Sequence, residues 1–240
     1  MGNKNSQLNE LLENAPKPIP KKTFDQLSQN LTKSICFIEG KNEIGTGAIY
    51  KIEEIPKFCC IITCFHVLSQ EYLFDAIIKF ERIDRFKLKP EWIGRVSFRQ
   101  KNEGDYLAIE LKPAGVKFLE DKGLIFLKVN SAKCDDQIVV IGYGDANLEN
   151  PEMSVGVGAI QTADELISKG FALEYYAATG PGTSGSPLVL WSGEAIGIHR
   201  SREDERGVFT AVLNVAGSRR FATSLAEIKK NILLDIGKIN

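Results

Sequence analysis

The stretch GPGTSGSP at residues 180–187, followed by the apolar run Leu188-Val189-Leu190, decides how the rest of the sequence is interpreted. Small residues on both sides of Ser184 allow the backbone to turn sharply and to approach a ligand closely. Such a turn can direct successive backbone N–H groups at one point, which is what a site for an oxyanion requires. The same composition is also typical of an ordinary turn, so residues elsewhere in the chain have to decide its role.

Two earlier segments place a chemically active side chain at the end of an apolar strand. The segment ITCFHVL at 62–68 puts His66 after a strand, and GDYLAI at 104–109 puts Asp105 before one. Each has an ordinary interpretation, the histidine as a satisfied structural residue and the aspartate as a turn or capping residue. Together with Ser184 they follow the chain order histidine, aspartate, serine, which is one of the three known orders of the serine triad.

Short strand patterns, separated by clusters of Gly, Pro, Asn or Asp, fill most of the chain. They lie at residues 35–39, 44–52, 59–65, 76–82, 92–99, 105–111, 124–129, 137–142, 155–161, 172–178, 187–191, 194–200 and 207–213. The spacing of apolar residues predicts a short helix at 23–34 and a C-terminal helix at 219–236. So many short strands with few helices indicate an all-β barrel or sandwich protein. Residues 112–123 divide the strands about evenly and are expected to connect two barrels.

Four motifs give the sequence a family resemblance: GTG at 45–47, TCFHV at 63–67, DYLAI at 105–109 and GTSGSP at 182–187. With these motifs the chain resembles the trypsin-like (chymotrypsin-fold) serine peptidases over about residues 35–215. The resemblance implies two six-stranded antiparallel β-barrels, a C-terminal helix and an active site in the cleft between the barrels. The expected division is a flexible tail at 1–22, an N-terminal barrel at 23–118, a C-terminal barrel at 119–218 and a C-terminal helix at 219–240.

The same resemblance assigns the catalytic roles. Ser184 is the expected nucleophile, His66 the base that takes its proton, and Asp105 the residue that orients the imidazole. The backbone N–H groups of Gly182 and Ser184 are the expected oxyanion hole. The family usually has Asp or Asn before the serine, where this chain has Thr183. Because an Asp there pairs with a new N-terminal ammonium in zymogen-activated enzymes, we expect no activation by that route.

Residues around the serine motif suggest a substrate preference. Thr179 and His199, spaced as they are around Ser184, look like the bacterial glutamyl endopeptidases, in which these positions bind a substrate glutamate in the primary specificity pocket. Arg200 and Arg202 follow the histidine, and they would either block the pocket or add positive charge for acidic substrates. The alternative is that His199 is a pocket-wall residue with no preference for acids.

The resemblance leaves two classes of function open. One is a serine endopeptidase that forms an acyl-enzyme, including a processing peptidase with a narrow cleavage sequence and an esterase-like use of the same triad. The other is a catalytically inactive trypsin-like fold that acts as a binding or scaffold module. Since all three triad residue types are present, we expect catalysis on a protein or peptide substrate.

Composition narrows the range of partners and cofactors. The chain has 240 residues, with 30 Lys and Arg against 31 Asp and Glu, so it lacks the basic charge expected of a nucleic-acid-binding protein. No apolar run approaches the ~20 residues of a membrane span. Along a strand, Cys60 and Cys64 would lie ~13 Å apart, too far to share one zinc ion. We therefore expect no metal or other cofactor, and we interpret the cysteines as reduced core residues of a cytoplasmic protein.

The N-terminus carries a short lipidation pattern. The sequence MGNKNS at 1–6 fits N-myristoylation on Gly2 in a eukaryotic host. A single acyl chain would give only weak membrane association, because one chain anchors marginally. Pro16, Pro18 and Pro20 favour an extended tail after it. The sequence identifies no regulatory partner.

Overall fold

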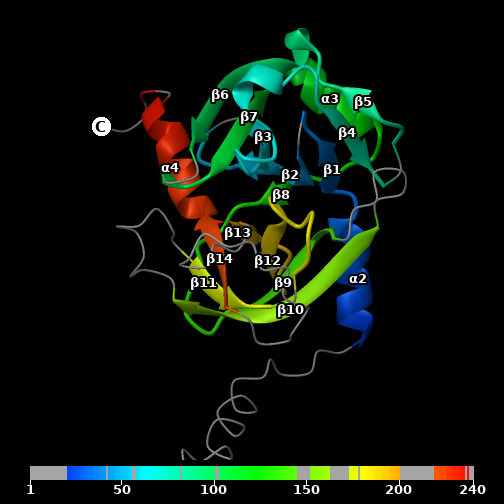
Figure 1. Cartoon of the computed structure of the whole chain (residues 1–240). Coiled ribbons are helices and arrows are strands. Elements are labelled where there is room, and N and C mark those ends of the chain that lie inside the picture. Colours follow the sequence, from blue (N-terminus) through cyan, green and yellow to red (C-terminus); the bar gives the residue numbers. More distant parts are fainter. Residues whose placement is uncertain are drawn as a thin grey trace, which may run out of the picture.

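The computed structural model describes residues 21–41, 43–55, 58–81, 83–100, 103–144, 152–162, 173–177, 179–200, 219–235 and 237. Most of the tail expected at 1–22, the strand expected at 207–213, and the candidate residues Gly2 and Arg202 lie outside these ranges. Within them the chain forms two β-sheets, stacked one above the other in Figure 1 and flanked by helices.

The first sheet has eight strands, seven of them in the order β5-β4-β1-β2-β3-β7-β6 and one, β8, parallel to β2. Their bounds are β1 (Ile35–Glu39), β2 (Ile44–Ile52), β3 (Phe58–Thr63), β4 (Ile77–Phe80), β5 (Phe86–Lys87), β6 (Ile93–Arg99), β7 (Tyr106–Leu111) and β8 (Leu127–Lys128). Two short 3₁₀ helices, η1 (Gln70–Tyr72) and η2 (Pro90–Trp92), join the strands. Among the described strands the pairing does not close into a ring, so the first of the two predicted barrels is an open half-barrel.

The second sheet is a closed barrel of six strands in the order β10-β11-β14-β13-β12-β9. The strands are β9 (Gln137–Tyr143), β10 (Met153–Thr162), β11 (Leu173–Tyr176), β12 (Pro187–Leu190), β13 (Ala195–His199) and β14 (Arg219–Ser224). Alternate residues such as Ile138 and Val140 fill its interior, together with Leu188 and Ile196 from the neighbouring strands. The all-β class and the six-stranded second barrel predicted for the chain are confirmed.

The helices differ from the sequence-based expectation in two places. Helix α2 (Lys21–Leu31) is close to the predicted 23–34, but α3 (Pro113–Asp121) occupies the segment expected to be a simple connection. Proline is tolerated in the first turn of a helix, so Pro113 does not prevent it. The C-terminal helix α4 (Leu225–Asp235) begins six residues later than predicted, because residues 219–224 form β14 and close the barrel.

A shared apolar core joins the two sheets. It contains strand residues of the first sheet, such as Ile49 and Ile62, together with Val139, Ile141 and Ile198 of the second. Cys36, Cys59, Cys60 and Cys64 are buried and unbonded, which confirms their interpretation as core thiols, and Cys134 is exposed. No helix of the described part is long and apolar enough to cross a membrane.

Candidate active site

His66 and Asp105 meet where two neighbouring strands end. His66 follows β3 and Asp105 precedes β7, and these strands pair with Thr63 opposite Leu107. His66 Nδ1 lies 2.7 Å from Asp105 Oδ2, and the His66 backbone N–H donates to Asp105 Oδ1 over 3.1 Å. The carboxylate therefore holds both the ring and the backbone of the histidine.

The turn that carries Asp105 has an uncommon backbone. Asp105 has a positive φ of 49°, and Gly104 before it has a φ of 136°. The Thr223 hydroxyl of β14 donates a hydrogen bond to the Gly104 carbonyl, so the second barrel supports this turn of the first sheet. Burial alone would raise the pKa of Asp105, but the hydrogen bonds and charge of His66 and the charge of Arg200 hold that pKa below its ordinary value.

Arg200 points to the Asp105 carboxylate. Its Nε lies 3.6 Å from Asp105 Oδ2, and the two side chains are only 3% and 1% exposed. This placement differs from the sequence-based expectation that Arg200 contacts substrate, because the charge is directed into the protein and paired with Asp105. Its backbone N–H donates to the Phe221 carbonyl, which aligns the residue along β14. The other arginine of that prediction, Arg202, lies outside the described residues.

The serine loop is fastened to both sheets. Gly182 and Gly185 have φ values of 86° and 87°, which glycine adopts without strain. The Ser184 carbonyl accepts from the Thr46 N–H of β2 over 2.8 Å, and the Gly185 N–H donates to the His199 carbonyl of β13 over 2.8 Å. Within the loop, Thr183 Oγ1 donates to the Gly180 carbonyl over 2.6 Å. A threonine therefore completes the loop where the family usually has Asp or Asn.

The expected oxyanion donors are available in this loop. Within the described part of the chain, neither the Gly182 N–H nor the Ser184 N–H donates to an acceptor. The Gly182 carbonyl is held by the Thr46 hydroxyl over 3.0 Å, which fixes the peptide plane after it. Among these residues Ser184 Oγ has no hydrogen bond to His66, a contact that in unliganded enzymes is often long and tightens with substrate.

His199 lies beside this loop, and Thr179 directly precedes the loop in the chain. The His199 N–H donates to the Ser186 carbonyl over 2.7 Å, and its ring Nδ1 lies 2.6 Å from the Tyr175 hydroxyl. Arg220 Nη2 donates to the Thr179 carbonyl over 3.4 Å. Burial, followed by the positive charges of Arg220 and His66, lowers the pKa of His199 to about 3. The imidazole of His199 is therefore neutral at physiological pH.

Three donor atoms of a metal-binding type also meet here. The ligand atoms of Cys64, His66 and Asp105 lie within 4.8 Å of one another. The Cys64 thiol is engaged with the His199 carbonyl over 3.2 Å, and burial raises the pKa of this thiol well above its ordinary value. Because a metal would need the thiolate and would displace the histidine–aspartate contact, the group fits proton transfer better than metal binding.

Several residues of the site were not anticipated from the sequence. Thr46 supports the serine turn and Thr223 supports the aspartate turn. Tyr175 contacts His199, and Arg220 contacts Thr179. Their roles depend on cross-strand pairing, above all on Tyr175 lying opposite Arg220. The sequence RRFATS at 219–224 does not alternate apolar and polar residues, so no local signal placed Arg220 on a strand.

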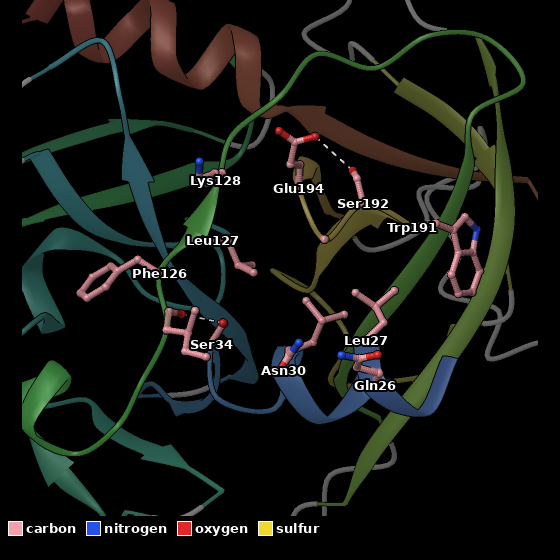
Figure 2. Close-up of a pocket in the computed structure, with 13 residues that line it drawn as sticks. Gln26, Leu27, Asn30, Ser34, Phe126, Leu127, Lys128, Trp191, Ser192 and Glu194 are labelled. Atoms are coloured by element: carbon pink, nitrogen blue, oxygen red, sulfur yellow. Dashed lines mark hydrogen bonds between the residues drawn. The ribbon is translucent and has the colours of Figure 1, made fainter. Parts of the chain in front are cut away.

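A separate groove lies away from these residues. It has a volume of about 460 Å³ and lies between α2, the segment at 125–128 and the hairpin that joins β12 to β13 (Figure 2). Leu27, Leu127 and Trp191 supply apolar walls, and Lys128 and Glu194 stand at its polar rim. None of the triad candidates lines it, so it is not the catalytic site.

Comparison with known proteins identifies the family. The family model of the trypsin-like peptidase domain matches residues 45–198. The chain belongs to this family. No individual curated protein matches the peptidase.

Solved structures similar to this trypsin-like peptidase include the Rv3671c protease from M. tuberculosis. The match to its inactive form has a TM-score of 0.60 and 15% sequence identity. This match covers 92% of the present chain and 98% of the Rv3671c chain. The match to its active form has a TM-score of 0.60 and 17% sequence identity, and it covers 92% of the present chain and 88% of the Rv3671c chain. The match to a mutant of Rv3671c in the inactive form has a TM-score of 0.59 and 16% sequence identity. It covers 94% of the present chain and 97% of the Rv3671c chain. At these identities the likeness concerns the fold, and the family assignment makes the chain a serine endopeptidase.

Proposed function

We propose that the peptidase cleaves peptide bonds with Ser184 as nucleophile, His66 as general base and Asp105 as the residue that orients the base. The 2.7 Å contact between His66 Nδ1 and Asp105 Oδ2 carries this proposal. With the ring proton on Nδ1 facing the carboxylate, Nε2 is left to accept the proton of the serine hydroxyl. The second hydrogen bond, from the His66 N–H, limits rotation of the carboxylate.

The reaction proceeds in two acyl transfers. Ser184 Oγ attacks the peptide carbonyl carbon while its proton passes to His66, which then gives it to the departing amine nitrogen. Water attacks the resulting ester by the same route and restores the serine hydroxyl. The N–H groups of Gly182 and Ser184 stabilise the negative oxygen of each tetrahedral intermediate.

We further propose that the peptidase prefers Glu, or Asp, before the scissile bond. Support comes from His199, which pairs with the Gly185 N–H and the Ser186 carbonyl of the serine loop, and from Thr179, which directly precedes that loop in the chain. A neutral His199 that accepts from the Tyr175 hydroxyl at Nδ1 keeps Nε2–H as a donor for a carboxylate.

Labelling with a serine-directed phosphonate tests the triad. We expect wild-type protein to take up one phosphonate per chain and Ser184→Ala to take up none, because only an activated hydroxyl reacts. Asp105→Asn is expected to slow labelling by about 10⁴-fold, since the imidazole would be held in the wrong tautomer. Ser192→Ala, at an exposed serine of the β12–β13 hairpin, is the matched control and labels normally. A folded wild-type protein that does not label would contradict the proposal and favour a binding module.

Peptide profiling tests the substrate preference. Peptides with Glu before the scissile bond are expected to have higher kcat/KM than otherwise identical peptides with Ala or Leu. Equal rates for all three would remove the acid preference while leaving the peptidase activity intact.

A further inference from the structure

The C-terminal helix α4 connects the two halves of the molecule. It directly follows β14 of the second barrel, and it lies against the first sheet beside β6 (Figure 1). Lys229 Nζ, near the middle of the helix, lies 2.6 Å from Glu54 Oε1, just beyond the end of β2. Asp235, the last residue of the helix, contacts β6 instead. The two contacts therefore fasten α4 to different parts of the first sheet.

Asp235 stands where its own helix disfavours a negative charge. The C-terminal end of a helix carries a partial negative charge, and the last turn of α4 has no basic residue to offset it. The compensating groups come from β6. Ser97 Oγ donates to Asp235 Oδ2 over 2.5 Å, and Arg99 Nη2 donates to Asp235 Oδ1 over 3.4 Å. The carboxylate is thus oriented by the strand that it contacts.

The network extends from β6 to β7. The Tyr106 hydroxyl lies 3.3 Å from Ser97 Oγ. Because the hydroxyl hydrogen of Ser97 is used on the Asp235 carboxylate, Tyr106 is the donor in this pair. Ser97 and Arg99 are two residues apart on β6, and Arg99 pairs with Tyr106, so all three lie on one face of the β6–β7 hairpin. One carboxylate on α4 therefore ties both strand ends together.

This hairpin carries the aspartate of the proposed triad. Tyr106 directly follows Asp105, and the Asp105 N–H donates over 3.0 Å to the carbonyl of Gln100, the residue after Arg99. A Cβ on Gly104 would lie 3.6 Å from Tyr106 Cδ1 and 3.7 Å from Arg99 Cβ, so the turn packs against both residues. A shift of the two strand ends would therefore move the turn that holds Asp105.

Strand β6 also reaches the segment that carries the histidine. The rings of Phe98 and Phe65 are stacked with their centroids 5.3 Å apart, and Phe65 directly precedes His66. Arg99 Nη1 donates to the Phe98 carbonyl over 2.7 Å. The guanidinium that Asp235 orients thus also contacts the backbone next to this stack. Both sides of the histidine–aspartate contact adjoin residues of the network.

We propose that Asp235 is a positioning residue of the peptidase. Through its bonds to β6 it fixes the end of the β6–β7 hairpin, and with it the direction from which Asp105 holds the His66 imidazole. This inference rests on the proposed serine peptidase activity. The Asp235 side chain is 38% exposed, so its ion pair adds little to the stability of the fold. Its effect is on geometry, and a small displacement of a catalytic group lowers the rate of the chemical step.

The kinetics of labelling with a serine-directed phosphonate test this role, because they separate the chemical step from binding. We expect Asp235→Ala to lower the maximal labelling rate by roughly 10- to 100-fold. The phosphonate concentration that gives half of the maximal rate should not change. Asp235→Glu keeps a carboxylate and should recover part of the rate. Asp121→Ala, at an exposed acid of α3, removes an equal charge elsewhere and should label as the wild-type protein does.

Lys229→Ala is the matched control on the same helix. It removes the contact of α4 with Glu54 and leaves the bonds from Asp235 to β6 in place, so labelling should proceed at the wild-type rate. If Lys229→Ala slows labelling as much as Asp235→Ala does, α4 acts only as a docked helix and the positioning role is wrong.

The partner of Asp235 on β6 provides a second variant. Arg99→Met should also slow labelling, and the double variant should label at nearly the rate of Asp235→Ala alone, because both changes break the same network. Losses that multiply would mean that the two residues act independently, and they would overturn the proposal. Should Asp235→Ala fail to fold, Asp235→Glu and Arg99→Met decide.

The failure of this inference and the failure of the proposed function have different signatures. If a folded Asp235→Ala protein labels at the wild-type rate, the positioning role is wrong and the peptidase assignment stands. If the folded wild-type protein itself does not label, the proposed function fails, and the positioning role fails with it.

Discussion

Three interactions hold the Asp105 carboxylate, and each of them stabilises its negative charge. His66 contributes two hydrogen bonds and Arg200 lies 3.6 Å away, around a carboxylate that is itself only 1% exposed. The arginine stabilises the anionic carboxylate, yet it also repels the positive charge that His66 gains during catalysis. Arg200 is thus expected to affect the pH range of the enzyme rather than the identity of its substrate.

Replacing Arg200 tests this effect. In Arg200→Met the neighbouring imidazole loses a repelling charge, so the positive charge that it gains during catalysis is less strongly opposed. The acid limb of the kcat/KM profile is expected to move upward by roughly one pH unit. Arg200→Lys keeps the charge and should keep the limb near its original position. If the acid limb of the kcat/KM profile does not move in a folded Arg200→Met protein, the arginine has only a structural role.

His199 makes the stability of the fold depend on pH. Burial, with the charges of Arg220 and His66, lowers its pKa to about 3 from an ordinary value of 6.5. Between these two pKa values the unfolded chain binds a proton at His199 that the folded chain does not bind. The contribution of His199 to the free energy of unfolding is therefore complete above pH 6.5 and declines as the pH falls. Urea unfolding should show the wild-type protein losing about 1 kcal/mol more than His199→Gln between pH 6.5 and pH 5.5. Equal losses in the two proteins would mean that His199 is protonated in the fold.

Among the structural elements, the serine loop combines close backbone contacts with positive φ values at Gly182 and Gly185. A Cβ on Gly185 would lie 2.0 Å from the Thr46 carbonyl oxygen and 2.6 Å from Thr63 Oγ1. Close approach at this point allows the hydrogen bonds from β2 and β13 to reach the loop. Gly193 has a similar φ of 91°, but its nearest neighbour would be Leu27 Cδ1 at 3.8 Å.

These two glycines form a matched pair for mutation. Gly193→Ala is expected to cost ~1–2 kcal/mol, the strain of a positive φ alone, and to label normally with phosphonate. Gly185→Ala adds a backbone clash, so it should cost ~2–4 kcal/mol and lose labelling because Ser184 is displaced. Thermal unfolding and labelling of both variants provide the comparison. Similar behaviour of the two would show that the loop can relax away from β2.

Strands with a clear apolar pattern were predictable as elements. The segments at 35–39 and 44–52 form β1 and β2 with the predicted bounds, since each contains a run of β-branched and aromatic residues. The strand β14 was missed because Phe221, Leu225 and Ile228 also fit the period of a helix. Only pairing with β11 and β13, far away in sequence, makes residues 219–224 a strand.

The catalytic residues were more predictable than the pocket. The serine motif, His66 and Asp105 each have local sequence signals, and their order along the chain matches that of the proposed triad. The cluster of Tyr175, Arg220 and His199 has none, because it depends on the register of three strands. The direction of Arg200 could not be predicted either, since a side chain that follows a strand can project to either face.

In the whole molecule, catalysis depends on how the two sheets are joined. Thr46 of β2 accepts from the Tyr143 N–H of β9 over 2.9 Å and donates to the Gly182 carbonyl over 3.0 Å. Val139 and Ile141 of the second barrel share the apolar core of the first sheet. The serine loop of one half is thereby aligned with the histidine and aspartate of the other.

Thr46→Val tests the coupling between the halves. The substitution keeps the shape of the side chain but leaves the Tyr143 N–H without this partner, at a cost of about 1–3 kcal/mol. Loss of the bond to Gly182 should also lower kcat/KM, by an order of magnitude or more, because the peptide between the two oxyanion donors loses its support. Thr32→Val, at the end of α2, should change neither value. A stable, fully active Thr46→Val protein would show that the apolar core alone sets the alignment.

The most direct test of the central claim is a crystal structure of the phosphonate adduct. We predict phosphorus bonded to Ser184 Oγ, one phosphonyl oxygen within about 3 Å of the Gly182 and Ser184 N–H groups, and His66 Nε2 facing Ser184 Oγ. The contact between His66 and Asp105 should persist. A label on another residue, or an imidazole turned away from Ser184, would contradict the account.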